Sequence, residues 1–148
     1  MKAAITGSAA APTLVVTESD GTVTTFQPAS GGAGKNLEFR PVSIAAVGDG
    51  SSTTFGYDAA TGVVTRIVAP LPDGLPADSC PPSGVLQPGC RALDLTYQTV
   101  TDPSGKSAQR LVKVSAVLFD PASKQMVTTP VTTYTYDLSL IHISEPTR

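Results

Sequence analysis

Two cysteines in one loop are the first residues of this sequence that could do chemistry. Cys80 and Cys90 bracket nine residues in a stretch rich in Pro and Gly. That span suits a disulfide, which would add about 2 to 3 kcal/mol by constraining the loop, and two free thiols are the alternative. A metal site is disfavoured because no second pair of cysteines completes a set of four ligands.

Three aspartates, Asp58, Asp120 and Asp137, each follow an aromatic residue at the end of an extended segment. Such carboxylates could be the paired acids of a glycosidase or ligands for calcium. All three occupy the same place at the start of a predicted turn, however, and a carboxylate there accepts backbone N–H groups. Turn capping therefore explains the whole set. A fourth, Asp94 in the alternating segment "DLTY", is expected on the solvent face of a strand.

Two further patterns resemble binding sites but have simpler explanations. The segment "GGAGKN" (31–36) is similar to a phosphate-binding loop, yet Ala29 stands where the pattern needs Gly and Asn36 where it needs Ser or Thr, so a flexible turn is favoured. A sugar-stacking platform is conceivable for the aromatic residues, but most of them end strands, which favours packing. The aromatic residues are Tyr57, Tyr97, Phe119, Tyr134 and Tyr136.

The segments that carry these residues have the composition of strands. Thr and Val are abundant, 13 Gly and 13 Pro interrupt the chain, and helix formers rarely recur at spacings of three and four. We predict an all-β fold of antiparallel hairpins, with a β-sandwich as the alternative. The sequence predicts a hairpin around Ser19-Asp20-Gly21, a strand within 40–48, and strand pairs in 52–70, 91–120 and 124–137. Residues 1–12 are expected to be disordered, and the Pro-rich segment 69–90 to be a surface loop or an edge crossing.

Composition limits the function classes. The chain has 148 residues, 41% of them hydrophobic, which suits one domain or a piece of a larger protein. With 10 basic and 12 acidic side chains it has no basic surface for nucleic acid or anionic lipid. No apolar run reaches the roughly 18 residues of a membrane helix, and no intact signal peptide opens the chain.

An aromatic-Asp pair followed by a turn and a new strand occurs repeatedly. "FGYDAATGVVTRI" and "VLFDPASKQMVTT" align, and "YTYD" begins a third copy. In the first copy Gly62 supplies the left-handed residue of the turn. In the second copy Lys124 stands in that place, which costs about 1 kcal/mol or requires another turn type.

Residues 50 to 137 resemble the Rhs, or YD-repeat, proteins, in the version common in large secreted actinobacterial proteins. The segments that carry the resemblance are "YDAATGVVTRI", "FDPASKQM", "YTYD" and "GCRALDLTY". In that family successive hairpins coil into a hollow shell that encloses or presents a C-terminal effector. The resemblance implies a structural segment, secreted or on the cell surface, with no catalytic, cofactor or metal residues. Its partners would be the rest of the parent protein and its effector. The repeat residues are Tyr57, Asp58, Gly62, Phe119, Asp120, Tyr136 and Asp137.

The last eleven residues, "LSLIHISEPTR" (138–148), match in one reading frame the translation of a transposon-end adapter used in sequencing libraries. We therefore expect residues 13–137 to be the β-rich, YD-repeat-like region and this tail to be foreign to the natural protein. His142, the single histidine of the chain, is then no candidate for catalysis or metal binding.

Two alternatives to the shell segment follow from the same residues. One is an independent β-sandwich module that binds a carbohydrate or a protein. The other is a fragment of an enzyme, which is disfavoured because the sequence has no nucleophile elbow, no HExxH and no Cys-His arrangement outside the tail.

Overall fold

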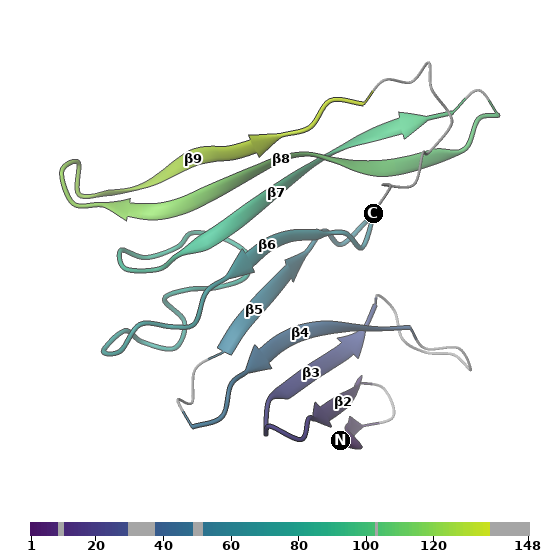
Figure 1. Ribbon diagram of the computed structural model, residues 1–148, viewed down its shortest axis with the longest axis vertical. Coiled ribbons are helices and arrows are strands. Elements are labelled where there is room, and N and C mark those ends of the chain that lie inside the picture. The colour runs from purple at the N-terminus through teal and green to yellow at the C-terminus, as the bar shows by residue number, and fades with distance from the viewer. Residues whose placement is uncertain (9–10, 30–37, 49–51, 103, 137–148) are drawn as a thin grey trace, which may run out of the picture.

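The computed structural model describes residues 1–8, 11–29, 38–48, 52–102 and 104–136, and these residues form one antiparallel sheet (Figure 1). Every strand pairs with the next one along the chain, so the sheet is a simple meander. The strands are β1 (Lys2–Ser8), β2 (Ala11–Thr17), β3 (Val23–Pro28), β4 (Phe39–Ala45), β5 (Ser52–Tyr57), β6 (Val64–Val68), β7 (Ala92–Thr101), β8 (Ser107–Asp120) and β9 (Gln125–Thr133).

The all-β, antiparallel prediction is confirmed, and the described residues lie in one open sheet and not in the two packed sheets of a sandwich. No helix long and apolar enough to cross a membrane occurs in the part of the chain that the structure describes.

The hairpin predicted around Ser19-Asp20-Gly21 joins β2 to β3. Asp20 Oδ1 accepts the backbone N–H of Thr22 at 2.9 Å, and Gly21 has a φ of 85°. The backbone N–H of Gly21 donates to the carbonyl of Glu18, which closes the turn. Local residue chemistry alone therefore sets this connection.

Two predictions about the ends of the chain differ from the structure. The segment 1–12 was expected to be disordered, but its described residues include the strand Lys2–Ser8, which pairs along its whole length with β2, from Lys2 opposite Thr17 to Ser8 opposite Ala11. The described part of the segment 124–137, up to residue 136, holds one strand, β9, where a pair was predicted. β9 pairs with β8 and lies at the edge of the described sheet, and Pro130 is tolerated there because an edge strand needs no N–H on its outer side.

The sheet has two faces of different character. Successive side chains alternate between faces, and residues directly opposite each other on paired strands share a face. One face contains Val68, Ala92 and Val117, which are paired in register across β6, β7 and β8. The Pro-rich loop between β6 and β7 covers these residues, so we call this side the loop face and the other side the open face.

The small core of the molecule lies between the loop and the sheet. Val68 and Cys90 are 1% and 0% exposed, and Leu86 of the loop packs against Ala92 and Val117 of the sheet. Residues 69–90 thus form a loop, as predicted, but one that lies over the middle of the sheet. The loop supplies the apolar cover that this part of a single-layer sheet would otherwise lack.

Candidate functional site

The disulfide and the hydrogen bonds within the Pro-rich loop give it a fixed shape. Cys80 and Cys90 form a disulfide, with their Cα atoms 5.5 Å apart. The N–H of Ala69 donates to the carbonyl of Arg91 at 2.9 Å and closes the base of the loop. Within the loop, Gln87 donates its N–H to the carbonyl of Ser79 at 3.0 Å. Six of the 22 residues in this segment are prolines, which have no N–H group, and the disulfide and these bonds together define its path.

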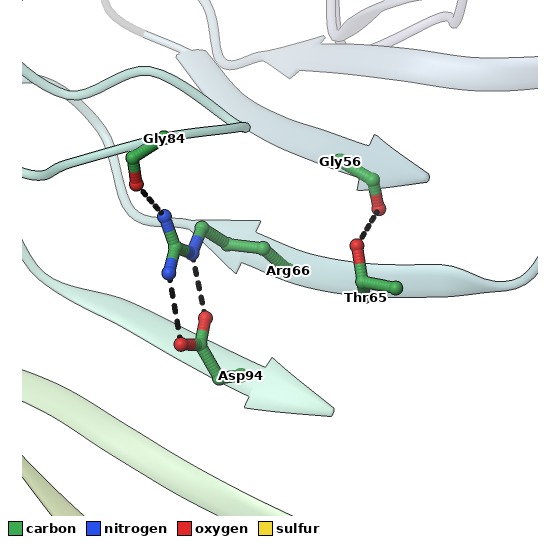
Figure 2. A network of polar contacts seen from close by, with 5 residues as sticks. All are labelled: Gly56, Thr65, Arg66, Gly84 and Asp94. Atoms are coloured by element: carbon green, nitrogen blue, oxygen red, sulfur yellow. Dashed lines mark hydrogen bonds and ion pairs between the residues drawn. The ribbon is translucent and has the colours of Figure 1, made fainter. Parts of the chain in front are cut away.

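Arg66 links two strands of the sheet by an ion pair and also binds the loop by a hydrogen bond (Figure 2). Arg66 on β6 donates from Nε and Nη2 to the two carboxylate oxygens of Asp94 on β7, at 2.6 and 2.8 Å. Its remaining nitrogen, Nη1, donates to the carbonyl of Gly84 at the loop tip, at 2.6 Å. A bidentate, charge-assisted contact of this kind is stronger than a neutral hydrogen bond. The hydrogen bond to Asp94 raises the pKa of Arg66.

The position of Asp94 corrects the expectation from the sequence. Asp94 lies on the loop face, opposite Arg66 in the register, and its side chain is only 30% exposed. The alternation of "LDLTY" (93–97) places Leu93 and Leu95 on the same side, and that side is the open face of the sheet. The sequence gives no signal that a residue 28 positions away provides a partner for Asp94.

A pocket of about 370 Å³ lies beside this ion pair. Its polar groups include Thr65, Ser83 and Thr96, and Pro82 provides an apolar wall. The guanidinium of Arg66 already makes three hydrogen bonds within the protein. The charged groups of the pocket are therefore engaged with each other and with the loop carbonyl of Gly84.

Gly56 lets the loop approach the sheet. A Cβ built on Gly56 of β5 would lie 2.0 Å from the carbonyl oxygen of Pro82. Gly56 is itself buried beneath the loop. The glycine of "FGYD" is thus required by a contact distant in sequence, and analysis of the sequence missed it.

The aspartates of the repeat cap turns, as predicted. Asp58 accepts the N–H of Ala60 and both the N–H and the hydroxyl of Thr61, at 2.7 to 3.1 Å. Asp120 accepts the corresponding groups of Ala122 and Ser123, at 2.6 to 3.2 Å. Asp137 lies outside the described residues. These two turns follow β5 and β8, which run in opposite directions, so they lie at opposite ends of the sheet and cannot act as paired acids.

A further turn of this kind, missed in the sequence, joins β7 to β8. Asp102 accepts the N–H of Ser104 and of Lys106 at 2.8 and 2.9 Å, and the hydroxyl of Ser104 at 2.6 Å. The signal was present in the sequence, since a Thr or Ser follows each of these aspartates by two or three residues. No group of three metal-binding side chains occurs among the residues that the structure describes, and the segment "GGAGKN" lies outside them.

Acid is expected to weaken these turns. The side-chain hydrogen bonds from Thr61, Ser104 and Ser123 lower the pKa values of Asp58, Asp102 and Asp120. In acid the unfolded chain therefore binds more protons than the folded chain. The stability that these three carboxylates contribute is fully present above about pH 4, and it is lost as the pH falls through their lower pKa values in the folded protein. Urea unfolding between about pH 6 and 2 measures this loss.

An amide variant isolates the contribution of the three carboxylates. In Asp58→Asn/Asp102→Asn/Asp120→Asn the side chains do not titrate, and the amide oxygen can still accept the turn N–H groups at positions 58 and 102, where a single oxygen accepts them, and one of the two at position 120. Its stability should fall less steeply with acid than that of the parent chain. Glu38→Gln, which removes an exposed carboxylate outside these turns, should keep the parent slope. Equal slopes in the triple variant and the parent would contradict the linkage.

Lys124 adopts the left-handed conformation that the repeat predicts for its position. Its φ is 55°, and the corresponding Gly62 has a φ of 73°. Lys124→Gly should therefore stabilise the protein by about 0.5 to 1 kcal/mol, because glycine avoids the Cβ clash of this conformation. Denaturant unfolding measures the gain, and Lys124→Ala, which keeps the Cβ, is the control that should show none. A loss of stability in Lys124→Gly would refute the strain.

The tyrosines of the repeat make a matching contact in two hairpins. Tyr57 donates its hydroxyl to the carbonyl of Pro41 at 2.6 Å, and Tyr136 donates to the carbonyl of Leu111 at 2.7 Å. In each hairpin the tyrosine follows the last paired residue, Thr54 or Thr133, by three positions. The strand partners of those last paired residues are Ser43 and Lys113. Each accepting residue lies two positions before Ser43 or Lys113, and one bulged valine lies between the two.

Each of these tyrosine hydroxyls takes the place of a backbone hydrogen bond between two strands, just beyond their last paired residues. Tyr57→Phe and Tyr136→Phe should each cost about 1 kcal/mol, since each leaves one carbonyl without its donor. Thermal or urea unfolding would measure the cost. Tyr97→Phe serves as a control, and a loss equal to that in Tyr57→Phe would show that the carbonyl contact is not the cause.

The remaining aromatic contacts do not form one platform. Arg40 stacks on the ring of Tyr57, 4.2 Å from its centroid, and burial raises the pKa of that tyrosine. Tyr97 lies on the open face, whereas Phe119, two residues after Val117, lies on the loop face. The five aromatic residues therefore cannot stack together on one flat ligand.

Comparisons with models of known protein families, with curated proteins and with solved structures found no match to this chain.

Proposed function

We propose that the chain is a non-catalytic structural segment of a large secreted or cell-surface YD-repeat protein of the Rhs type. In this proposal the sheet is part of a β-shell that encloses or presents a C-terminal effector. Its partners are the rest of the parent protein and that effector. The chain itself carries no catalytic or cofactor-binding residues.

The observation that carries the proposal is the matched pair of hairpins. In β4–β5 and in β8–β9 a tyrosine hydroxyl bonds to the carbonyl before a bulge, at the same offsets from the last paired residues. Two units built by the same rule, with an aspartate directly after each tyrosine, are what a repeat architecture predicts. A meander in which each strand contacts only its neighbours can also be lengthened by further hairpins.

The single layer of strands favours this function over an independent binding module. A small module that folds alone needs a core closed on both sides, and the described strands supply a core on the loop face only. The segment is then expected to depend on neighbouring hairpins for stability.

The test extends the chain in its natural reading frame. The source DNA is sequenced beyond codon 137 by a method without transposon adapters, and residues 1–137 are expressed alone and with one, two and three of the following hairpins. The free energy of unfolding should rise with each added hairpin. A frame that stops directly after the eleven tail codons, or an unchanged stability on extension, would refute the repeat assignment. Turnover by the purified chain on a panel of glycans and peptides would refute the non-catalytic role.

A further inference from the structure

The open face of the sheet is apolar over its whole width. Register and alternation assign to it large apolar side chains from all nine strands. None of them is buried, and Ile44, Leu93 and Leu118 are 37%, 40% and 43% exposed. The principal members are Ile5, Leu14, Val16, Phe26, Ile44, Phe55, Ile67, Leu93, Leu95, Leu118 and Val127.

The charged side chains of the strands are also distributed unequally between the two faces. Six charged residues within the strands belong to the loop face by register, and a seventh, Asp120, is the last residue of β8, where it caps a turn. The open face therefore carries no charge within the described strands except at that turn. The six residues are Lys2, Arg40, Arg66, Asp94, Arg110 and Lys113.

We propose that the open face is a dimer interface and that a second copy of this chain covers it. An exposed, contiguous apolar surface of this extent marks an interaction site, because water in contact with it is unfavourable. Nine strands spaced about 4.8 Å apart and about 20 Å long present roughly 800 Å², which is the area that one partner contributes to a standard stable interface. Two such faces bring no like charges together, and twisted sheets pack face to face at about −30°.

The assembly is a symmetric β-sandwich made from two chains. A twofold axis sets the same patch of each copy against the other, so the contact closes at two chains and does not propagate. The loop faces, with their charges and disulfide loops, then point outwards into solvent. This inference stands on the sheet alone and does not depend on the proposed shell function.

The first test measures the molecular mass of the unmutated 148-residue chain in solution across a range of protein concentrations. Sedimentation or light scattering from about 1 to 100 µM should show a monomer converting to a dimer with a Kd in the micromolar range. A monomer at every concentration would overturn the proposal, all the more clearly if it binds an apolar dye such as ANS. Species larger than a dimer would also overturn it, because a closed twofold contact cannot produce them.

A pair of matched variants then identifies the face. Leu93→Lys places a charge at the centre of the open face and should weaken the dimer roughly 100-fold or more, since the charge is buried without a partner. Val85→Lys makes the same chemical change on the loop, where the valine is 82% exposed, and should leave the dimer intact. Leu118→Lys repeats the test from β8, and circular dichroism verifies that each variant keeps its strands. Association through strand edges would survive both leucine variants, and that result would overturn the proposal.

Discussion

Removing the Cys80–Cys90 disulfide should lower the free energy of unfolding by about 3 kcal/mol, because the bond closes a loop of about ten residues in the unfolded chain. The loss should begin at the loop and not in the sheet. Cys90 is fully buried against the core, and the loop also provides Leu86 to cover Val117. Once the loop is released, that patch of the sheet is exposed to water.

The experiment compares dithiothreitol with mutation. Urea unfolding of the parent chain with and without dithiothreitol gives the contribution of the bond, and Cys80→Ala/Cys90→Ala should reproduce the reduced state. Dithiothreitol should not affect the double variant, which excludes a general effect of the reagent. Hydrogen exchange should accelerate first at the amides of Ser79, Gln87 and Cys90, which bond within the loop. Equal stability of the oxidised and reduced chains would refute the role of the disulfide.

The second large effect is expected from a single methyl group. Gly56→Ala should cost about 2 kcal/mol, because its Cβ would lie 2.0 Å from the carbonyl oxygen of Pro82 and the loop must lift to admit it. A backbone oxygen cannot rotate away as a side chain can. Hydrogen exchange should show the loop exposed while β1 to β4 keep their protection.

Two comparisons separate this clash from other effects of removing a glycine. Gly74→Ala is the control, since no atom lies within 4 Å of its Cβ and its cost comes only from a φ of 84°. It should lower stability by about 1 kcal/mol without releasing the loop. Gly56→Ala combined with loss of the disulfide should cost less than the sum, because both changes release the same loop. Full additivity would show that the loop does not couple them.

The local chemistry of the turns could be predicted from the sequence. Asp20 with Gly21, and Asp58 with Gly62, sit in turns whose hydrogen bonds form within a few residues, so residue type and spacing suffice. Lys124 adopts the strained conformation that alignment with Gly62 predicts. The same reasoning predicted the antiparallel hairpins, since consecutive strands joined by short turns pair with each other.

Contacts between segments that are distant in the chain could not be predicted from the pattern of the sequence. Asp94 was expected to face solvent, because its partner Arg66 is identified only once β6 and β7 pair in register. The need for Gly56 arises only when the loop lies over β5. The strand at 2–8 was missed because its small residues have little preference for a strand until β2 offers a partner.

The sequence by itself thus determined the class of fold, the positions of the turns and the alternation that separates two faces, because each depends on interactions within or between adjacent segments. Only the tertiary structure decided which face the Pro-rich loop covers and which face stays open. That choice depends on the register of Val68, Ala92 and Val117 across three strands and on the hydrogen bond from Arg66 to the loop carbonyl of Gly84. Register between strands is set by packing across the whole sheet, and a periodicity of two cannot specify which side of the sheet will be covered.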